Sequence, residues 1–153
     1  MFSQGFEVEM WFKAAMRQLK MTDKNPPTLA EIKKVLLQRL RAKSDKALRH
    51  LKDIDDAEEW LDLALKCDQL ISLENESGEK IRIAVDVTSN PEQIKYKFDL
   101  IDSHAFHLAR MDLRIQKHWI VLVNPNCLPE KDRIVDVFYE LVDRVSTTEI
   151  IKL

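Results

Sequence analysis

The sequence predicts an α/β or α+β domain with three layers, in which helices flank a mixed β-sheet. Two runs indicate the sheet. Residues 80–88 are rich in β-branched side chains and have no helical period, and residues 118–123 are almost continuously apolar. Amphipathic runs with a 3.6-residue period lie on both sides of them and indicate helices. The chain has 153 residues, and we expect one domain with a helical part at 1–67, a sheet core at 68–123 and a C-terminal helix at 130–145.

The composition limits the class of protein. The hydrophobic fraction is 45% and the charged fraction 33%, values ordinary for a soluble globular protein. Lys and Arg total 24 against 26 Asp and Glu, so any binding of nucleic acid requires a local basic patch. The N-terminus lacks the layout of a signal peptide, and no apolar run approaches the roughly 18 residues of a membrane span. We therefore expect a cytoplasmic protein with no membrane partner. Cys67 and Cys127 are too few for a disulfide framework or a zinc site.

Four helices are expected before the sheet. The first has an apolar stripe that includes Val8, Phe12 and Ala15 at helical spacing. Thr28 and Glu31 form a capping box that opens the second helix. Ser44 is expected to cap a third, and Asp55 or Asp56 a fourth. The expected ranges are 6–20, 29–43, 44–54 and 55–67.

The period changes after residue 67. A hairpin is expected over 68–89, with a first strand at 68–73 and a turn around Ser77-Gly78. Asn90-Pro91 is a helix-start signal, and the helix that follows is expected to break near Ser103 and resume to about residue 115. The strand–helix–strand unit from 81 to 123 should be right-handed, which makes its two strands parallel. No element is predicted after the helix at 130–145.

Charge is segregated within the helical part. Residues 31–52 are strongly basic, and residues 53–62 form an acidic cluster. Either these are two solvated helical faces that pair with each other, or the basic segment is a surface that contacts phosphates. In the second interpretation, Arg39, Arg41 and Lys43 are the candidate residues that bind nucleic acid.

Two acids stand out by their position, Asp68 and Asp86. They are 18 positions apart, a spacing that a hairpin can fold back on itself. Two carboxylates on adjacent strands can hold Mg²⁺, which prefers oxygen ligands and activates water against phosphate esters. The alternative is structural: Asp68 ends an acidic helix, and Asp86 pairs with a neighbouring Arg or Lys.

The order of these features resembles that of the PD-(D/E)XK nuclease superfamily. An acid opens a hairpin, a second acid lies inside the next strand, and a helix and an apolar strand follow. Asp68 matches the first acid of its pattern, and Asp86-Val87-Thr88 matches Asp/Glu-x-Lys. Glu7 or Glu9 matches the acid that members commonly carry on a preceding helix, with Glu58 and Glu59 as competitors. The resemblance implies a restriction-endonuclease-like core that hydrolyses DNA phosphodiesters with Mg²⁺ held by Asp68 and Asp86.

The departure from the family pattern is Thr88, which occupies the position of the strand lysine. In some members the lysine has moved to the following helix, so Lys95 and Lys97 are the candidates to replace it here. The alternative is a non-catalytic DNA-binding factor, or an excision or recombination accessory factor, on the same fold. A third hypothesis is a homodimeric protein-interaction module, suggested by the Trp and Met content of the N-terminal helix and by the charge blocks.

The remaining candidates are histidines and tryptophans. His104 and His107 are three residues apart on an expected helix and could bind a metal if a third ligand such as Asp102 or Cys127 came near, although such pairs are usually exposed to solvent. His118 opens a strand without an obvious partner. The three tryptophans are interpreted as core residues.

Overall fold

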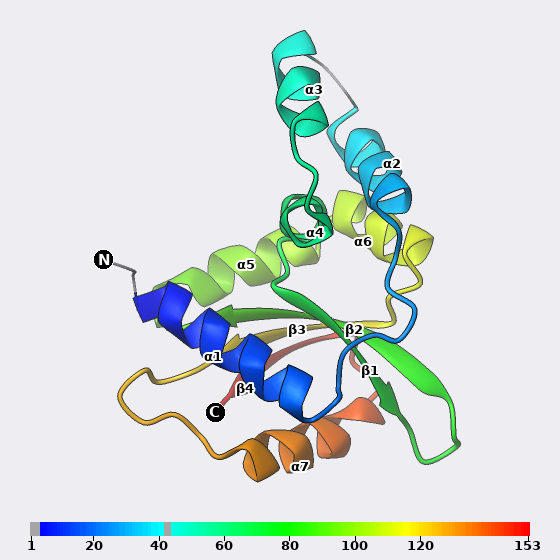
Figure 1. Ribbon diagram of the computed structural model, residues 1–153. Coiled ribbons are helices and arrows are strands. Elements are labelled where there is room, and N and C mark those ends of the chain that lie inside the picture. The colour runs from blue at the N-terminus through cyan, green and yellow to red at the C-terminus, as the bar shows by residue number, and fades with distance from the viewer. Residues whose placement is uncertain (1–3, 42–43) are drawn as a thin grey trace.

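The computed structural model describes residues 4–41 and 44–153 and contains a four-stranded mixed sheet with helices on both faces (Figure 1). The strand order is β1-β2-β3-β4. β1 and β2 are antiparallel, whereas β2, β3 and β4 are parallel. The strands are β1 (Gln69–Glu74), β2 (Lys80–Thr88), β3 (Lys117–Leu122) and β4 (Thr148–Lys152). The helices are α1 (Gln4–Gln18), α2 (Leu29–Leu40), α3 (Asp45–Lys52), α4 (Ala57–Leu65), the short 3₁₀ helix η1 (Pro91–Gln93), α5 (Ile94–Ile101), α6 (His104–Asp112) and α7 (Lys131–Val142).

Two hydrophobic clusters lie on opposite faces of the sheet. Ile83, Val85 and Val87 of β2 pack with α1 and α7 on one face, whereas Ala84 packs with α2, α4 and α6 on the other. In Figure 1, α4, α5 and α6 lie above the sheet and α7 lies below it. Successive residues of a strand point to opposite faces, so β2 contributes to both clusters. The predicted class, a mixed sheet flanked by helices, is confirmed.

The helix starts follow from local caps. The Thr28 hydroxyl accepts a hydrogen bond from the Glu31 backbone N–H at 3.2 Å, as the capping box predicted. Asp56, rather than Asp55, caps α4 by accepting from the Glu58 N–H at 2.8 Å. Ser103 caps α6, so the predicted break in the long helix is also confirmed. Each cap satisfies an N–H group that has no partner inside its helix.

Within residues 4–41 and 44–153, four residues with positive φ are not glycine, and all four are basic: Lys20, Arg41, Lys66 and Arg114, with φ between 51° and 58°. Three of them end predicted helices earlier than expected. α1 stops at Gln18, α2 at Leu40 and α4 at Leu65, although the sequence pattern continued to 20, 43 and 67. The left-handed conformation that closes a helix usually belongs to glycine. The sequence has only 2 glycines, so cationic side chains occupy these positions and bear the steric cost.

The other differences concern strands and the C-terminus. β1 begins at Gln69, so Asp68 lies one residue before the strand and not on it. α7 ends at Val142 instead of residue 145, and Val145 is 98% exposed. The unpredicted strand β4 pairs with β3 in parallel. β4 is five residues long and only Ile151 in it is buried, so its apolar pattern was too weak to predict a strand.

Candidate functional site

The hairpin brings Asp68 and Asp86 together. In the register of β1 and β2, Gln69 lies opposite Val85, which places the preceding residue Asp68 opposite Asp86. The Asp68 backbone N–H donates to the Val85 carbonyl at 2.8 Å, and its carboxylate Oδ2 accepts from the Val87 N–H at 2.6 Å. The Asp68 side chain therefore continues the ladder of hydrogen bonds by one position beyond the strand. These contacts hold one carboxyl of the predicted pair in place.

The second carboxyl, Asp86, is only 3% exposed and binds Lys97 of α5. The Lys97 Nζ lies 2.7 Å from the Asp86 Oδ2, and the Asp86 side chain also hydrogen-bonds to that of Asp68. Lys95 is exposed. Residues two apart on a helix point about 200° from each other, so only one of the two lysines can face the sheet. Of the two predicted lysines, the structure places Lys97 at the acid pair.

The surroundings of the acid pair raise the pKa of Asp68. Burial raises the pKa of Asp68 from 3.8 to about 9, and the nearby negative charge of Asp86 adds to the effect. The hydrogen bond from the Val87 N–H acts in the opposite direction but is weaker. At neutral pH the pair therefore retains a proton on Asp68, while Lys97 compensates Asp86.

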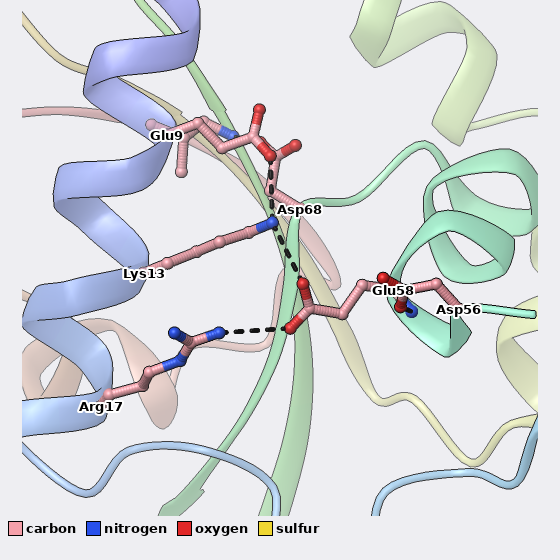
Figure 2. A network of polar contacts seen from close by, with 7 residues as sticks. Glu9, Lys13, Arg17, Asp56, Glu58 and Asp68 are labelled. Carbon is pink, nitrogen blue, oxygen red and sulfur yellow. Dashed lines mark hydrogen bonds and ion pairs between the residues drawn. The ribbon is translucent and has the colours of Figure 1, made fainter.

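An ion-pair network on α1 borders Asp68. Lys13 Nζ lies 3.1 Å from Glu9 Oε1 and 3.6 Å from Glu58 Oε2. Arg17 also contacts Glu58, at 3.4 Å. Figure 2 shows the Asp68 side chain beside Glu9 and the Lys13 ammonium, and the charge of Glu9 contributes to the raised pKa of Asp68.

Of the helix acids that the sequence predicted, Glu9 is the one whose charge acts on Asp68. Glu7, the other residue that matched the family pattern, is exposed, because two positions along a helix reverse the direction of a side chain. Glu58 belongs to the same network, but through Lys13 and Arg17.

The donor set of the pair suits a hard divalent cation. Mg²⁺ is usually bound by one or two carboxylates and keeps several waters, and Asp68 and Asp86 are such a set. Within residues 4–41 and 44–153, no group of three or more His, Cys, Asp or Glu side chains is arranged to hold a metal ion. Any metal here would thus depend on two protein carboxylates and on water.

Thr88, at the position of the family lysine, is used in the turn after β2. It is 7% exposed, and its hydroxyl accepts from the Asn90 N–H at 3.1 Å. Asn90 in turn accepts from the Glu92 N–H at 3.0 Å and begins η1. This turn directs the chain into α5, on which Lys97 returns to Asp86. Thr88 thus stabilises the turn that positions α5, and α5 carries Lys97 to the acid pair.

The predicted nucleic-acid contacts on α2 are not equivalent. Arg39 is half-buried: it donates to the Ala64 carbonyl, and its guanidinium carbon lies 4.5 Å from the centre of the Phe106 ring. Arg41 is exposed in the left-handed position that ends α2, and Lys43 lies outside the described residues. Arg39 thus joins α2 to α4 and α6, which occupies its guanidinium with internal contacts.

His118 is the buried polar residue that the sequence pattern did not resolve. It is fully buried on β3, and neither ring nitrogen has a hydrogen-bond partner in the described part of the chain. Burial, followed by the charges of Arg110 and Lys97, lowers its pKa from 6.5 to about 3. His104 and His107 are exposed on α6. In the sequence, the burial of His118 was indicated only by its position at the start of an almost continuous apolar run.

No family model, no curated protein and no solved structure matches the chain. Among the helices of the described residues, none has both the length and the apolar character needed to span a membrane.

Proposed function

We propose that the protein is a metal-dependent nuclease of the PD-(D/E)XK type that acts on DNA, with a restriction-endonuclease-like core. The observation that carries the proposal is the meeting of Asp68, Asp86 and Lys97, with Lys97 Nζ 2.7 Å from Asp86. The order of α1, the β1–β2 hairpin, α5 and β3 supports it, because the same order carries the acids and the lysine in that family.

In this proposal Asp68 and Asp86 hold Mg²⁺, which when bound supplies an activated water and charge neutralisation at a phosphodiester. Lys97 orients Asp86 through their ion pair, and its ammonium is the chain's own cation at the acid pair. Glu9 adds negative charge beside Asp68, and Lys13 limits that charge by pairing with Glu9. Asp86 is buried, and the lower dielectric around it strengthens these interactions.

The test is metal-dependent cleavage by purified protein. With Mg²⁺ or Mn²⁺, plasmid and oligonucleotide DNA should be cut, and Asp86→Asn should abolish the activity. Lys97→Met should reduce it by roughly 10²-fold or more, the loss typical of a removed charge-stabilising group. Lys95→Met, the matched exposed lysine on the same helix, should retain it. Cleavage that persists in Asp86→Asn would rule out this assignment.

Metal binding provides a second readout that does not require turnover. A ligand that binds only the folded state stabilises it, by about 2.7 kcal/mol at a hundred times its Kd. Mg²⁺ should therefore raise the Tm of the wild type and not of Asp86→Asn. An equal rise in both proteins would place the metal elsewhere.

The second candidate is a non-catalytic DNA-binding or accessory factor on the same scaffold. It is favoured by Thr88, whose hydroxyl serves the β2–η1 turn, and by the complete charge pairing of Asp86 with Lys97. This candidate predicts DNA binding without cleavage, insensitive to Asp86→Asn and strongly weakened by salt. Absence of a gel shift at low salt would eliminate it.

A further inference from the structure

A basic hollow of about 350 Å³ lies beside the outer end of β1. Its cations come from three separate parts of the chain: Lys20 and Lys24 in the connection between α1 and α2, Lys80 at the start of β2, and Arg114 after α6. All four side chains are exposed, and within the described residues none of them forms an ion pair. Like charges from distant segments repel one another, so this grouping favours an anionic ligand.

The fifth cation of the hollow, Arg82, is fixed in its wall. Arg82 Nε lies 2.5 Å from Asp23 Oδ2, and Nη1 donates to the Leu113 carbonyl at 2.7 Å. Asp23, one of the two acids lining the hollow, is thereby neutralised, which leaves Glu74 as the other. Arg82 is thus held in place by its contacts, and the exposed cations of the hollow outnumber its remaining acid, Glu74.

The basic hollow neighbours a second hollow that reaches Asp68. A second hollow of about 220 Å³ includes Asp68, Gln69 and Leu70 and shares Thr22 and Asp23 with the first. The backbone bridge between Thr22 and Ile71 lies between them. From Asp68 to Glu74 the chain advances six residues, which is about 20 Å in a strand. A ligand of about 20 Å that passes over the Thr22–Ile71 bridge therefore reaches from the free cations to Asp68.

We propose that the basic hollow binds the phosphates of a single-stranded DNA segment whose continuation passes over the Thr22–Ile71 bridge toward Asp68 and Asp86. Tyr139 of α7 lines the same hollow and is 49% exposed, so it offers a ring on which a base can stack. Phosphate-binding cations combined with an aromatic platform are the features of single-strand binding surfaces. The route toward Asp68 rests on the proposed function, whereas phosphate binding in the hollow does not.

The test is fluorescence anisotropy of a labelled oligo-dT in EDTA, as a function of salt. Four phosphate contacts give a slope of log K against log salt of about −3 for a single strand. The triple variant Lys20→Gln/Lys24→Gln/Lys80→Gln should flatten the slope by about 2 and weaken binding at least roughly tenfold at low salt. The charge-matched control, Arg133→Gln/Arg144→Gln/Lys152→Gln, changes exposed cations outside the hollow and should bind as the wild type does.

Tyr139→Ala should weaken oligo-dT binding and leave the salt slope unchanged, because stacking releases no counterions. Duplex DNA of equal length should compete less well than single-stranded DNA. Equal losses in the two triple variants, or better competition by duplex, would overturn the proposal. Because the assay contains no divalent metal, a positive result together with inactive protein would reject the nuclease alone. Metal-dependent cleavage with unaltered binding by the triple variant would reject the hollow alone.

Discussion

Replacement of Asp68 by asparagine should change how the stability of the protein depends on pH. Asp68 is ionised in the unfolded chain above pH 3.8, whereas burial and the charge of Asp86 raise its pKa in the fold to about 9. The native state therefore binds one more proton than the unfolded state between these values. A group of this kind stabilises the fold at low pH, and the stabilisation is lost as pH rises toward the folded pKa.

The magnitude follows from one proton. A difference of one bound proton changes the free energy of unfolding by about 1.4 kcal/mol per pH unit. Between pH 5.5 and 7.5 the wild type should thus lose about 3 kcal/mol relative to Asp68→Asn. Asparagine can still accept from the Val87 N–H and donate to Asp86, but it has no proton to lose.

The assay is urea denaturation of both proteins at several pH values in the absence of divalent metal, analysed by linear extrapolation. Titrations elsewhere in the chain affect both proteins and cancel in the difference. Glu7→Gln, an exposed carboxyl on α1, is the matched control and should follow the wild type. If the difference between wild type and Asp68→Asn stays constant across this range, Asp68 is not protonated in the fold and the account of the acid pair is wrong.

Three further predictions concern stability, each measured by denaturant unfolding. Lys97→Met should cost about 3 kcal/mol by leaving Asp86 buried without its partner, whereas Lys95→Met should change stability by less than about 0.5 kcal/mol; similar values for the two would refute the pairing. His118→Leu should stabilise the fold by about 1 kcal/mol, because the buried ring has no hydrogen-bond partner in the described residues. The same variant should lose less stability than the wild type as pH falls from 6.5 toward 3, because the His118 ring stays neutral in the fold. An unchanged loss of stability over this pH range would contradict the prediction. Lys66→Gly should stabilise by about 0.5–1 kcal/mol because φ is 51° there, and a loss would show that the lysine has a compensating role.

Much of the candidate site followed from local sequence pattern. The β-branched run at 80–88 predicted β2 and the exposed turn predicted the hairpin, so the approach of Asp68 to Asp86 could be expected from spacing alone. The Asn90-Pro91 start signal placed a helix after β2 and made Lys95 and Lys97 the candidate lysines.

Which lysine and which helix acid lie at the pair could not be predicted. That choice depends on the rotation of α5 and α1 about their axes, which packing against the sheet determines. The helix-end predictions failed for a related reason: Lys20, Arg41 and Lys66 take a left-handed conformation that their residue types disfavour.

The sequence by itself determined the class of the fold, the hairpin and the identity of the acid pair, because these depend on periodicity and on short-range turn signals. Only the tertiary structure decided that Lys97 binds Asp86, that Glu9 rather than Glu7 lies near Asp68, and that Arg39 is engaged internally. It also assembled Lys20, Lys24, Lys80 and Arg114 around one hollow. The physical reason is that burial and the proximity of charges arise between segments far apart in the chain. Burial and proximity raise the pKa of Asp68, and proximity groups the exposed cations beside β1.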